Sequence, residues 1–424
     1  MVEIVRERQF NEEGLSDSLI NITKRICIPI DKEEYKRIIL DHKEFRKYVD
    51  KLIIEHKELF PSTIDKGYTF HDILPESKKL QDIRIRRIGL KSDREIFTVV
   101  PSFILPYMVG FTEDVDKPLF LRRFGIPFWA LTYVFGRNDM YWYRIENRFG
   151  RNSIVGTTVR NSDNLPTDIL SDEKQSWENG ERIFIATTVA NDCILGASVA
   201  KDAGTESLTE AYGHFKTEAQ NLCPTYEPET VNTDGWTSTQ LALKQLFPTV
   251  VVILCFLHSF INIRSCCKNM KEHFSEICKR VWDVYHSPNK HEFITKIGEL
   301  GIWASKTIPI GTGLNAIKKL CSKSDEFVKA YDHPSAHRTS NMLDRLMDFQ
   351  DRYIYNCKYF HGNRISSEYS VRAWALLYNF HPYCPRVEIS SQYQSPAHKL
   401  NGFVYHENWL QNLLVSASMG GFRR

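Results

Sequence analysis

Strand-like and helix-like stretches follow one another in a definite order between residues 169 and 257. Three strand-like runs come first, and helices then alternate with strands. The runs lie at 169–177, 182–192 and 193–201, followed by a helix at 205–222, a strand at 229–236, a helix at 238–247 and a strand at 250–257. This order predicts a mixed α/β sheet with helices on both faces.

The chain before residue 119 combines helices with a hairpin. Apolar residues recur at helical spacing among many charges over residues 31–60, which predicts an amphipathic helix or a pair of helices. Residues 82–90 alternate apolar and basic, and a second strand-like run follows at 95–100. We therefore expect a β-hairpin with its arginines mostly on the outer face. These are Arg84, Arg86 and Arg87.

Residues 119–149 have the pattern of helical segments on either side of a turn, GRND. On the second segment Tyr141, Arg144 and Arg148 share a face, which fits a helix-turn-helix whose second helix enters the major groove of DNA. The alternative is an ordinary helical pair. The aromatic stripe of this region is expected to be core: Phe128, Trp129, Tyr133 and Trp142.

Residues 259–337 are helical in pattern and contain no strand-like run. The helix-like run with Asp344 follows them, so they are interpreted as an insertion before the last helix of the α/β domain. The predicted parts are an N-terminal helical region (1–80), a hairpin and helix-turn-helix region (81–160), an α/β domain (161–258 with 338–424) and the insertion (259–337).

Charge is concentrated in one segment. The whole chain carries a net charge of +3, whereas residues 117–160 hold eight cations against two anions. Such a stretch attracts a phosphate backbone, but charge alone does not separate this use from a solvated helix face. The cations are Lys117, Arg122, Arg123, Arg137, Arg144, Arg148, Arg151 and Arg160.

Ten cysteines are scattered without a CxxC pair, which argues against a zinc ribbon or finger. The start of the chain has no apolar region typical of a secretory signal. The longest apolar run, near Val250–Leu257, is far shorter than the ~18 residues of a membrane span. We therefore expect a cytoplasmic protein with reduced thiols and no membrane partner.

Two aspartates lie in separate strands of the predicted sheet. Asp172 is near the middle of the first strand, and Asp234 ends the fourth, directly before Gly235. Ligands collect at such strand ends in open α/β sheets, and glycine permits a tight turn there. A single aspartate before a turn is better explained by turn chemistry. The pair favours a site for Mg²⁺, or Mn²⁺, which binds carboxylates, water and phosphate oxygens.

A third acidic ligand is expected from one helix face. Asp344, Asp348 and Asp351 are spaced i, i+4 and i+7, so any of them can reach a metal, or all can be solvated partners of neighbouring arginines. Asp344 is nearest the helix start, where the helix dipole favours a carboxylate.

Other side chains are candidates for contacts with a substrate. Lys174 lies two residues after Asp172 and so on the same strand face, which suits a phosphate contact. Cys255 and His258 have the spacing of two zinc ligands, but a structural zinc needs four, for which Cys266 and Cys267 are possible additions. Trp177 and Trp236 can stack on bases, although core packing is the commoner use of tryptophan.

The chain resembles insertion-sequence transposases of the DDE/D type, especially the Mutator-like group. The resemblance covers most of the chain from about residue 82. Its motifs are DEK with the GERIFIATTVANDCILG hairpin, TDGW, the CFLH that closes the fifth strand, RTSNxxD, LYNFHPYCP and NWLQNLLVSASMGG. Many members have Glu as the third acid, whereas the matching position here is Asp344.

The resemblance implies a ribonuclease-H-like catalytic domain that cuts the ends of a mobile element and joins them to target DNA. Asp172, Asp234 and Asp344 would hold two Mg²⁺ ions, and His258 would lie beside the active site. Double-stranded DNA is the implied partner, with at least a homodimer for synapsis and association with the nucleoid when bound. The alternatives are a catalytically inactive DNA-binding descendant and a ribonuclease-H-like nuclease that cuts without joining.

Overall fold

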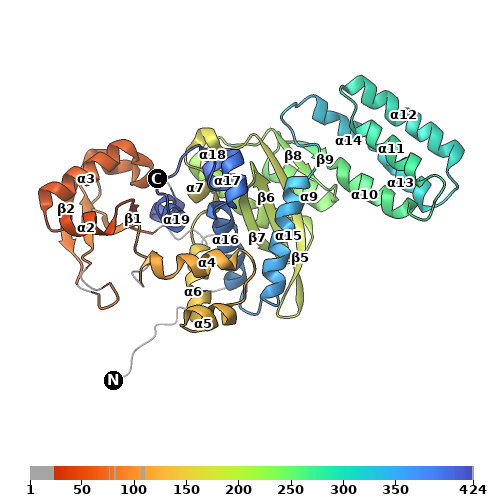
Figure 1. Ribbon diagram of the computed structural model, residues 1–424. Helices are drawn as coiled ribbons and strands as arrows, with labels where there is room; N and C mark the ends of the chain where they lie inside the picture. The colour runs from red at the N-terminus through yellow and green to blue at the C-terminus, as the bar shows by residue number, and fades with distance from the viewer. Residues whose placement is uncertain (1–22, 76, 81–82, 107–109, 423–424) are drawn as a thin grey trace.

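The computed structural model describes residues 23–75, 77–80, 83–106 and 110–422. The start of the chain, to which the prediction about a secretory signal applies, lies outside these residues, as does the first residue of the predicted hairpin. A four-stranded sheet, a central five-stranded sheet and a helical lobe lie side by side along the molecule (Figure 1).

The central sheet has the strand order β7-β6-β5-β8-β9. Strands β5, β8 and β9 are parallel, whereas β6 is antiparallel to both of its neighbours. The predicted order of three strands followed by alternating helices and strands is therefore confirmed. The strands are β5 (Asp168–Glu178), β6 (Glu181–Ala190), β7 (Cys193–Ala200), β8 (Thr230–Thr233) and β9 (Val251–Leu254).

Two tight turns set the register of the first three strands. Asn179 and Gly180 join β5 to β6, and Asn191 and Asp192 join β6 to β7, all with positive φ. Two-residue turns with positive φ at both positions match the twist of a hairpin, and asparagine, aspartate and glycine adopt them most readily. Leu170 consequently pairs with Val189 across the first hairpin.

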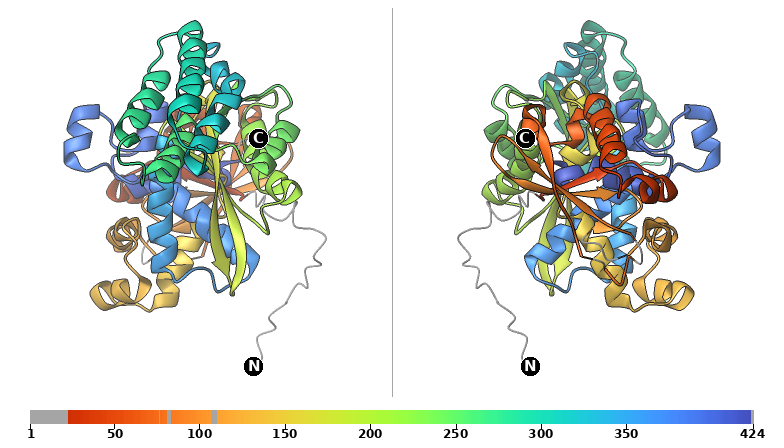
Figure 2. Two further views of the ribbon diagram at one scale, coloured as in Figure 1. Left: turned by 90° about the vertical axis from the view of Figure 1, so that its right-hand side faces the viewer. Right: turned by 90° about the vertical axis from the view of Figure 1, so that its left-hand side faces the viewer.

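Helices cover both faces of this sheet (Figures 1 and 2). Leu170 on β5 belongs to the core that includes residues of α15 and α16, whereas its neighbour Ile169 belongs to the core beneath α8 and α9. This alternation follows from the two-residue period of a strand. The covering helices are α8 (Thr205–Leu222), α9 (Thr237–Leu246), α15 (Asn341–Asn356) and α16 (Arg364–Phe380).

The N-terminal part is a second sheet as well as a helical region. Its strand order is β1-β4-β3-β2. The predicted hairpin β3–β4 therefore lies between two strands, β1 and β2, that come before residue 80. The expectation that Arg86 faces outward is wrong, because it is only 2% exposed and donates to the carbonyl of Ile39. The elements are β1 (Arg25–Ile28), α2 (Lys32–Ile38), α3 (His42–Glu55), β2 (Tyr68–Ile73), β3 (Arg86–Leu90) and β4 (Ile96–Pro101).

Helices α4 (Asp116–Arg122), α5 (Phe128–Phe135) and α6 (Asp139–Phe149) occupy the region predicted as a helix-turn-helix. The aromatic stripe is not all core: Trp142 is 2% exposed, but Trp129 and Tyr133 are 65% and 87% exposed. Nearly all residues of α5 are apolar, so its sequence has no polar face that would show which side is buried.

A buried ion pair ties this region to α15. The guanidinium of Arg122 donates to both carboxylate oxygens of Glu146, and the hydroxyl of Tyr353 on α15 donates to the same carboxylate. The Glu146 charge raises the pKa of Arg122 despite burial, which lowers it. Helices α4, α6 and α15 are therefore held together by one charged, hydrogen-bonded cluster.

The predicted insertion forms a helical lobe with a core of its own (Figure 2). It leaves the sheet after β9 and returns at α15. The fifth strand ends at Leu254, earlier than predicted, because a helix begins at Phe256. The lobe contains α10 (Phe256–Cys267), α11 (Phe274–Tyr285), α12 (Lys290–Thr307), α13 (Thr312–Ser322) and α14 (Ser324–Val328).

The remaining helices pack around the central sheet and the N-terminal sheet. They are α7 (Ile154–Thr158), α17 (Pro385–Ser391), α18 (Pro396–Asn401) and α19 (Trp409–Ser416). Within the described residues, none of the helices combines the length and the apolar character needed to cross a bilayer.

Candidate metal centre

Two neighbouring parallel strands supply the first two aspartates. Asp172 lies inside β5, and Asp234 directly follows the last residue of β8. The turn after β8 depends on Gly235, whose φ is 99°. A side chain other than hydrogen is strained in that conformation. The amide of Trp236 donates to Asp234 at 2.8 Å, which fixes the carboxylate at the start of this turn.

The third acid comes from the first turn of α15. Ser340 precedes this helix, and its hydroxyl donates to Asp344 at 3.1 Å. The same hydroxyl lies 3.3 Å from Nδ1 of His258, which is in the first turn of α10. His258 was expected to close the fifth strand and instead belongs to a helix. One serine thus holds an acid and a histidine from two different helices.

Asp172, His258 and Asp344 converge. One ligand atom from each lies within 4.8 Å of the others, and all three side chains are half-buried. Asp234 is not within that distance of all three, but it is near enough for its charge to raise the pKa of Asp172. Three of the four predicted site residues are therefore brought together, and the fourth lies beside them.

The site concentrates negative charge. Burial, then Asp234, then Glu173 raise the pKa of Asp172 to about 7. Burial also raises the pKa of Asp344, against the opposing effect of His258. Carboxyl groups that resist ionisation together become favourable ligands once a cation offsets their repulsion. The oxygen donors fit a divalent cation such as Mg²⁺ or Mn²⁺.

His258 is the positive side chain within this cluster. Its pKa is raised to about 9, first by a hydrogen bond with Cys255 and then by the charges of Cys255, Asp344 and Asp172. The pKa of Cys255 is lowered because its hydrogen bonds with His258 and Ser340 outweigh its burial. The imidazolium charge therefore partly balances Asp172 and Asp344.

Glu173 is a half-buried acid that sequence reasoning did not single out. It lies on the opposite face of β5 from Asp172 and accepts from Tyr212 on α8 at 2.7 Å and Thr239 on α9 at 2.5 Å. Burial raises its pKa. These two hydrogen bonds fix the part of β5 that carries Asp172, so Glu173 positions the strand beneath the site.

The alternatives for the third acid are separated by their surroundings. Asp351 pairs with Lys174 at 2.5 Å, and Asp348 is exposed to solvent. Asp344 is the member of this helix face that approaches Asp172. Lys174 shares the strand face of Asp172 as predicted, but its ammonium group is directed to α15 by the pairing with Asp351.

A groove opens beside Asp234 and reaches the helical lobe. It has a volume of about 360 Å³ and is lined by Asp234, Trp236 and His258 together with residues of α10 and α13. Lys319 of α13 and Lys323, which directly follows this helix, supply its positive charge. Sequence reasoning missed both lysines, because a predicted insertion gives no local signal of which residues return to the site. Trp236 is 40% exposed, contrary to the expectation of core packing.

In the part of the chain that the structure describes, Cys255 belongs to no group of three or more metal-ligating side chains. Cys267, one possible addition, is buried in the core of the lobe. Among the described residues, the group of Asp172, His258 and Asp344 stands alone as a cluster of three or more metal-ligating side chains.

The residues proposed to read DNA lie on α6, away from these acids. Arg144 is exposed, whereas Tyr141 and Arg148 are half-buried. Arg148 lines a cavity together with Arg25 of β1 and Thr98 of β4. The guanidinium carbon of Arg137 lies over the ring of Tyr141, 5.5 Å from the ring centroid. The three side chains share a helix face, but only Arg144 is well exposed on it.

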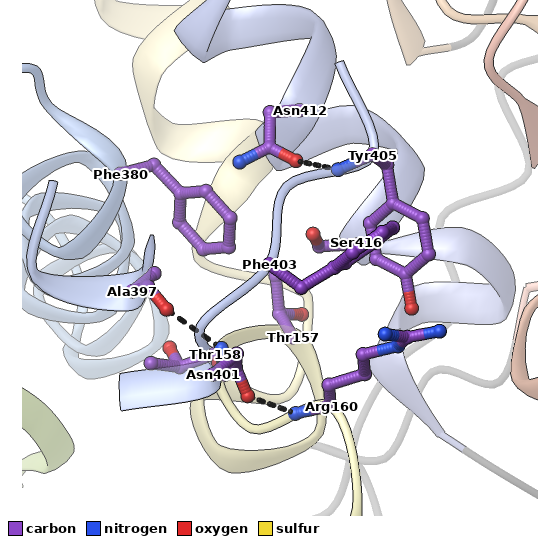
Figure 3. Close-up of a pocket in the computed structure, with 10 residues that line it drawn as sticks. All are labelled: Thr157, Thr158, Arg160, Phe380, Ala397, Asn401, Phe403, Tyr405, Asn412 and Ser416. Atoms are coloured by element: carbon purple, nitrogen blue, oxygen red, sulfur yellow. Dashed lines mark hydrogen bonds between the residues drawn. The ribbon is translucent and has the colours of Figure 1, made fainter. Parts of the chain in front are cut away.

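A small pocket near the C-terminus is a structural feature (Figure 3). Its volume of about 10 Å³ suits roughly one water molecule. Its polar groups are already used: Asn401 donates to the carbonyl of Ala397 and accepts from the amide of Arg160, and Asn412 accepts from the amide of Tyr405. These hydrogen bonds join α18 to the chain after α7, and α19 to the loop that precedes it.

Comparison with protein-family models gave no match for this chain, and a search of curated proteins gave none either.

Proposed function

We propose that this chain is a DNA transposase of the DDE/D type with a ribonuclease-H-like catalytic domain. The observation that carries the proposal is the convergence of Asp172 and Asp344, from a central strand and a covering helix, with Asp234 at the end of the neighbouring strand. The strand order with one antiparallel member is the arrangement expected for such a domain. Double-stranded DNA is the proposed substrate.

The donor set fits a divalent cation. Asp172, Asp234 and Asp344 would hold it, as Mg²⁺ or Mn²⁺. The bound metal would supply Lewis acidity, which lowers the pKa of an attacking water and stabilises the leaving oxygen. In hydrolysis, a water oxygen bonds to phosphorus, the bond from phosphorus to the 3′ oxygen breaks, and that oxygen takes up a proton.

The chain's own residues position this chemistry. Ser340 holds Asp344 and the imidazole of His258 in one orientation. His258 carries a proton beside the acids, since its pKa is raised. Lys319 and Lys323 bring positive charge to the groove beside Asp234, where a DNA phosphate would lie. In the joining step, the freed 3′-hydroxyl replaces water as the nucleophile at a target phosphate.

The test uses purified protein with duplexes taken from the DNA that flanks the coding sequence, in Mg²⁺ or Mn²⁺. Asp172→Asn and Asp234→Asn should each abolish cleavage. Asp348→Asn, on the same helix as Asp344 but exposed, is the matched control and should retain it. Cleavage that survives both strand variants would refute the metal assignment.

A second assay separates joining from cutting. A duplex end with a free 3′-hydroxyl should be transferred to plasmid DNA by a transposase, and we expect joined product with the wild-type chain. Cleavage without any joined product would favour a nuclease. Binding without cleavage would favour an inactive DNA-binding descendant. We also propose at least a dimer in the active complex, because two element ends must be held together, and a cytoplasmic location at the nucleoid.

A further inference from the structure

A second groove runs along β5 away from the acids. It lies between the C-terminal halves of β5 and α15 and has a volume of about 440 Å³. Figure 1 shows the two elements side by side. Lys174, Ser176 and Trp177 line it from the strand, and Arg352, Tyr355 and Tyr359 line it from the helix and the loop that follows.

The groove continues the surface on which Asp172 lies. Residues 172, 174 and 176 are alternate positions of one strand and so share a face. Successive positions on that face are about 7 Å apart. A polymer chain that leaves the acids along this face therefore meets Lys174 first and Ser176 next, without crossing the sheet.

Aromatic rings are presented to solvent in this groove. Tyr355 is 71% exposed, Tyr359 is 40% exposed and Trp177 is 37% exposed. The cation Arg352 lines the same groove. Exposed rings interleaved with cations are the arrangement that binds unpaired bases, because every base has a face that can stack.

The backbone holds Tyr359 in place at some cost. Lys358 and Tyr359 both have positive φ, at 53° and 68°, a conformation unfavourable for residues other than glycine. The next residue, Phe360, donates its amide to Trp177 at 3.1 Å and accepts from the amide of Asn179 at 2.9 Å. These bonds to the end of β5 keep the loop, and with it Tyr359, over the groove.

One side chain of the groove, Ser176, has a hydroxyl without a hydrogen-bond partner among the described residues. The hydroxyl of Ser176 is buried and forms no hydrogen bond with any described residue, although Ser176 lines the groove. A buried hydroxyl without a partner is unfavourable. It is suited to donate to an oxygen of a bound molecule.

The charge around the groove favours a polyanion. Lys174 and Arg352 line it, and Arg352 is exposed. The one lining acid, Asp351, is already paired with Lys174. The surplus is positive, as a phosphate backbone requires.

We propose that this groove binds unpaired nucleotides of the DNA strand that leaves the candidate metal centre, with bases on Tyr355 and Tyr359 and phosphates facing Lys174 and Arg352. A duplex does not satisfy these contacts, because its base faces are already stacked. The assignment of DNA and of the strand's direction rests on the proposed function. Base stacking on the two tyrosines is a separate claim about the groove.

The test measures fluorescence anisotropy of a short labelled oligothymidylate with the full chain and no divalent metal, so that binding is separated from cleavage. Tyr355→Ala and Tyr359→Ala should each weaken binding by about 5- to 150-fold, the loss expected for one stacked base. Tyr355→Phe keeps the ring and should bind within about twofold of wild type. Tyr133→Ala on α5 removes a tyrosine that is more exposed and far away along the sequence, and it should have no effect.

The outcomes separate the groove from the catalytic proposal. Wild-type affinity in both alanine variants, with unchanged thermal melting, would overturn the groove assignment. An equal loss for the single strand and for the matching duplex would also overturn it, since it would indicate general phosphate contacts. Loss of single-strand binding in a protein that neither cuts nor joins DNA would support the groove and refute the proposed function.

Discussion

Asp234 raises the pKa of Asp172 more than any other charged side chain does. The two residues come from neighbouring parallel strands that pair at Leu170 and Asn232, so the sheet itself brings them together. Their mutual repulsion is built into the position of the strands. It is unfavourable for folding and favourable for binding a cation, and both effects can be measured.

The first prediction concerns metal-free stability. The pKa of Asp172 is about 7 in the fold against 3.8 for the ordinary group, so the folded state holds its proton longer and the free energy of unfolding falls as pH rises from about 4 to 7. Asp172→Asn should therefore be more stable than wild type at pH 8, by on the order of 1–3 kcal/mol after allowance for partial exposure. The two should converge near pH 4 in urea titrations.

Added Mn²⁺ provides the complement to that measurement. It should raise the melting temperature of the wild type by mass action and that of Asp172→Asn much less. Asp325→Asn, an exposed acid on α14, is the control and should follow the wild type. A wild-type curve that is flat with pH and insensitive to Mn²⁺ would contradict the assignment.

The second prediction concerns the buried ion pair of α4 and α6. Glu146→Gln leaves Arg122 as an uncompensated buried charge, and such losses cost about 3–5 kcal/mol. Urea unfolding should show this decrease. Glu113→Gln breaks a surface pair with Lys32 in which Glu113 is 69% exposed, and should cost less than about 1 kcal/mol. Equal effects of the two changes would show that the buried cluster contributes no more than the surface pair.

The third prediction concerns acid stability. His381 is buried against Phe120 and beside Arg123, and burial followed by the Arg123 charge lowers its pKa to about 4. A histidine with a depressed pKa contributes stability above about pH 6.5 that is lost as pH falls toward 4. The loss should be on the order of 3 kcal/mol.

Urea midpoints from pH 4.5 to 7 test this loss. His381→Gln should lower stability at pH 7 and flatten the curve. His291→Gln, an exposed histidine on α12, should leave the slope unchanged. A wild-type slope that persists in His381→Gln would assign the acid sensitivity to another group.

The fourth prediction concerns duplex binding by α6. Arg144 is the exposed cation of the predicted reading face, so Arg144→Ala should weaken duplex binding and reduce the slope of log affinity against log salt by about one. Arg386→Ala, an exposed arginine on α17, is the control. Arg148→Ala should mainly affect stability, because its side chain lines a cavity against β1 and β4. Unchanged binding in Arg144→Ala would remove α6 as the reading helix.

The central sheet was predictable from sequence because its elements carry strong local signals. The dipeptide Asn179-Gly180 is typical of a hairpin turn, and the apolar runs on either side of it have the length and composition of strands. The end of β9 was missed because VVVILCFL is apolar throughout, and apolar content does not tell a strand end from the first turn of the helix at Phe256. Trp129 and Tyr133 were misassigned because exposure depends on which neighbour packs against α5.

The acids of the candidate site were predictable from sequence, but the side chains that surround them were not. Asp172 and Asp234 follow from strand positions, and Asp344 follows from a helix face that also held Asp348 and Asp351. The choice among those three depended on Lys174, which takes up Asp351 in a pair that no local pattern encodes. Lys319 and Lys323 reach the site only because the lobe folds back toward β8.

The two ends of the helical lobe are held together by contacts between residues 255–256 and residues 338–340. The thiol of Cys255 contacts both the hydroxyl and the amide of Ser340 at 3.2 Å, and the amide of Phe256 donates to the carbonyl of Arg338. The residues between them form the lobe, whose two ends meet beside the candidate metal centre. The contacts of Cys255 and Phe256 with residues 338–340 therefore fix where α10 and α15 begin, whatever the path of the chain between them.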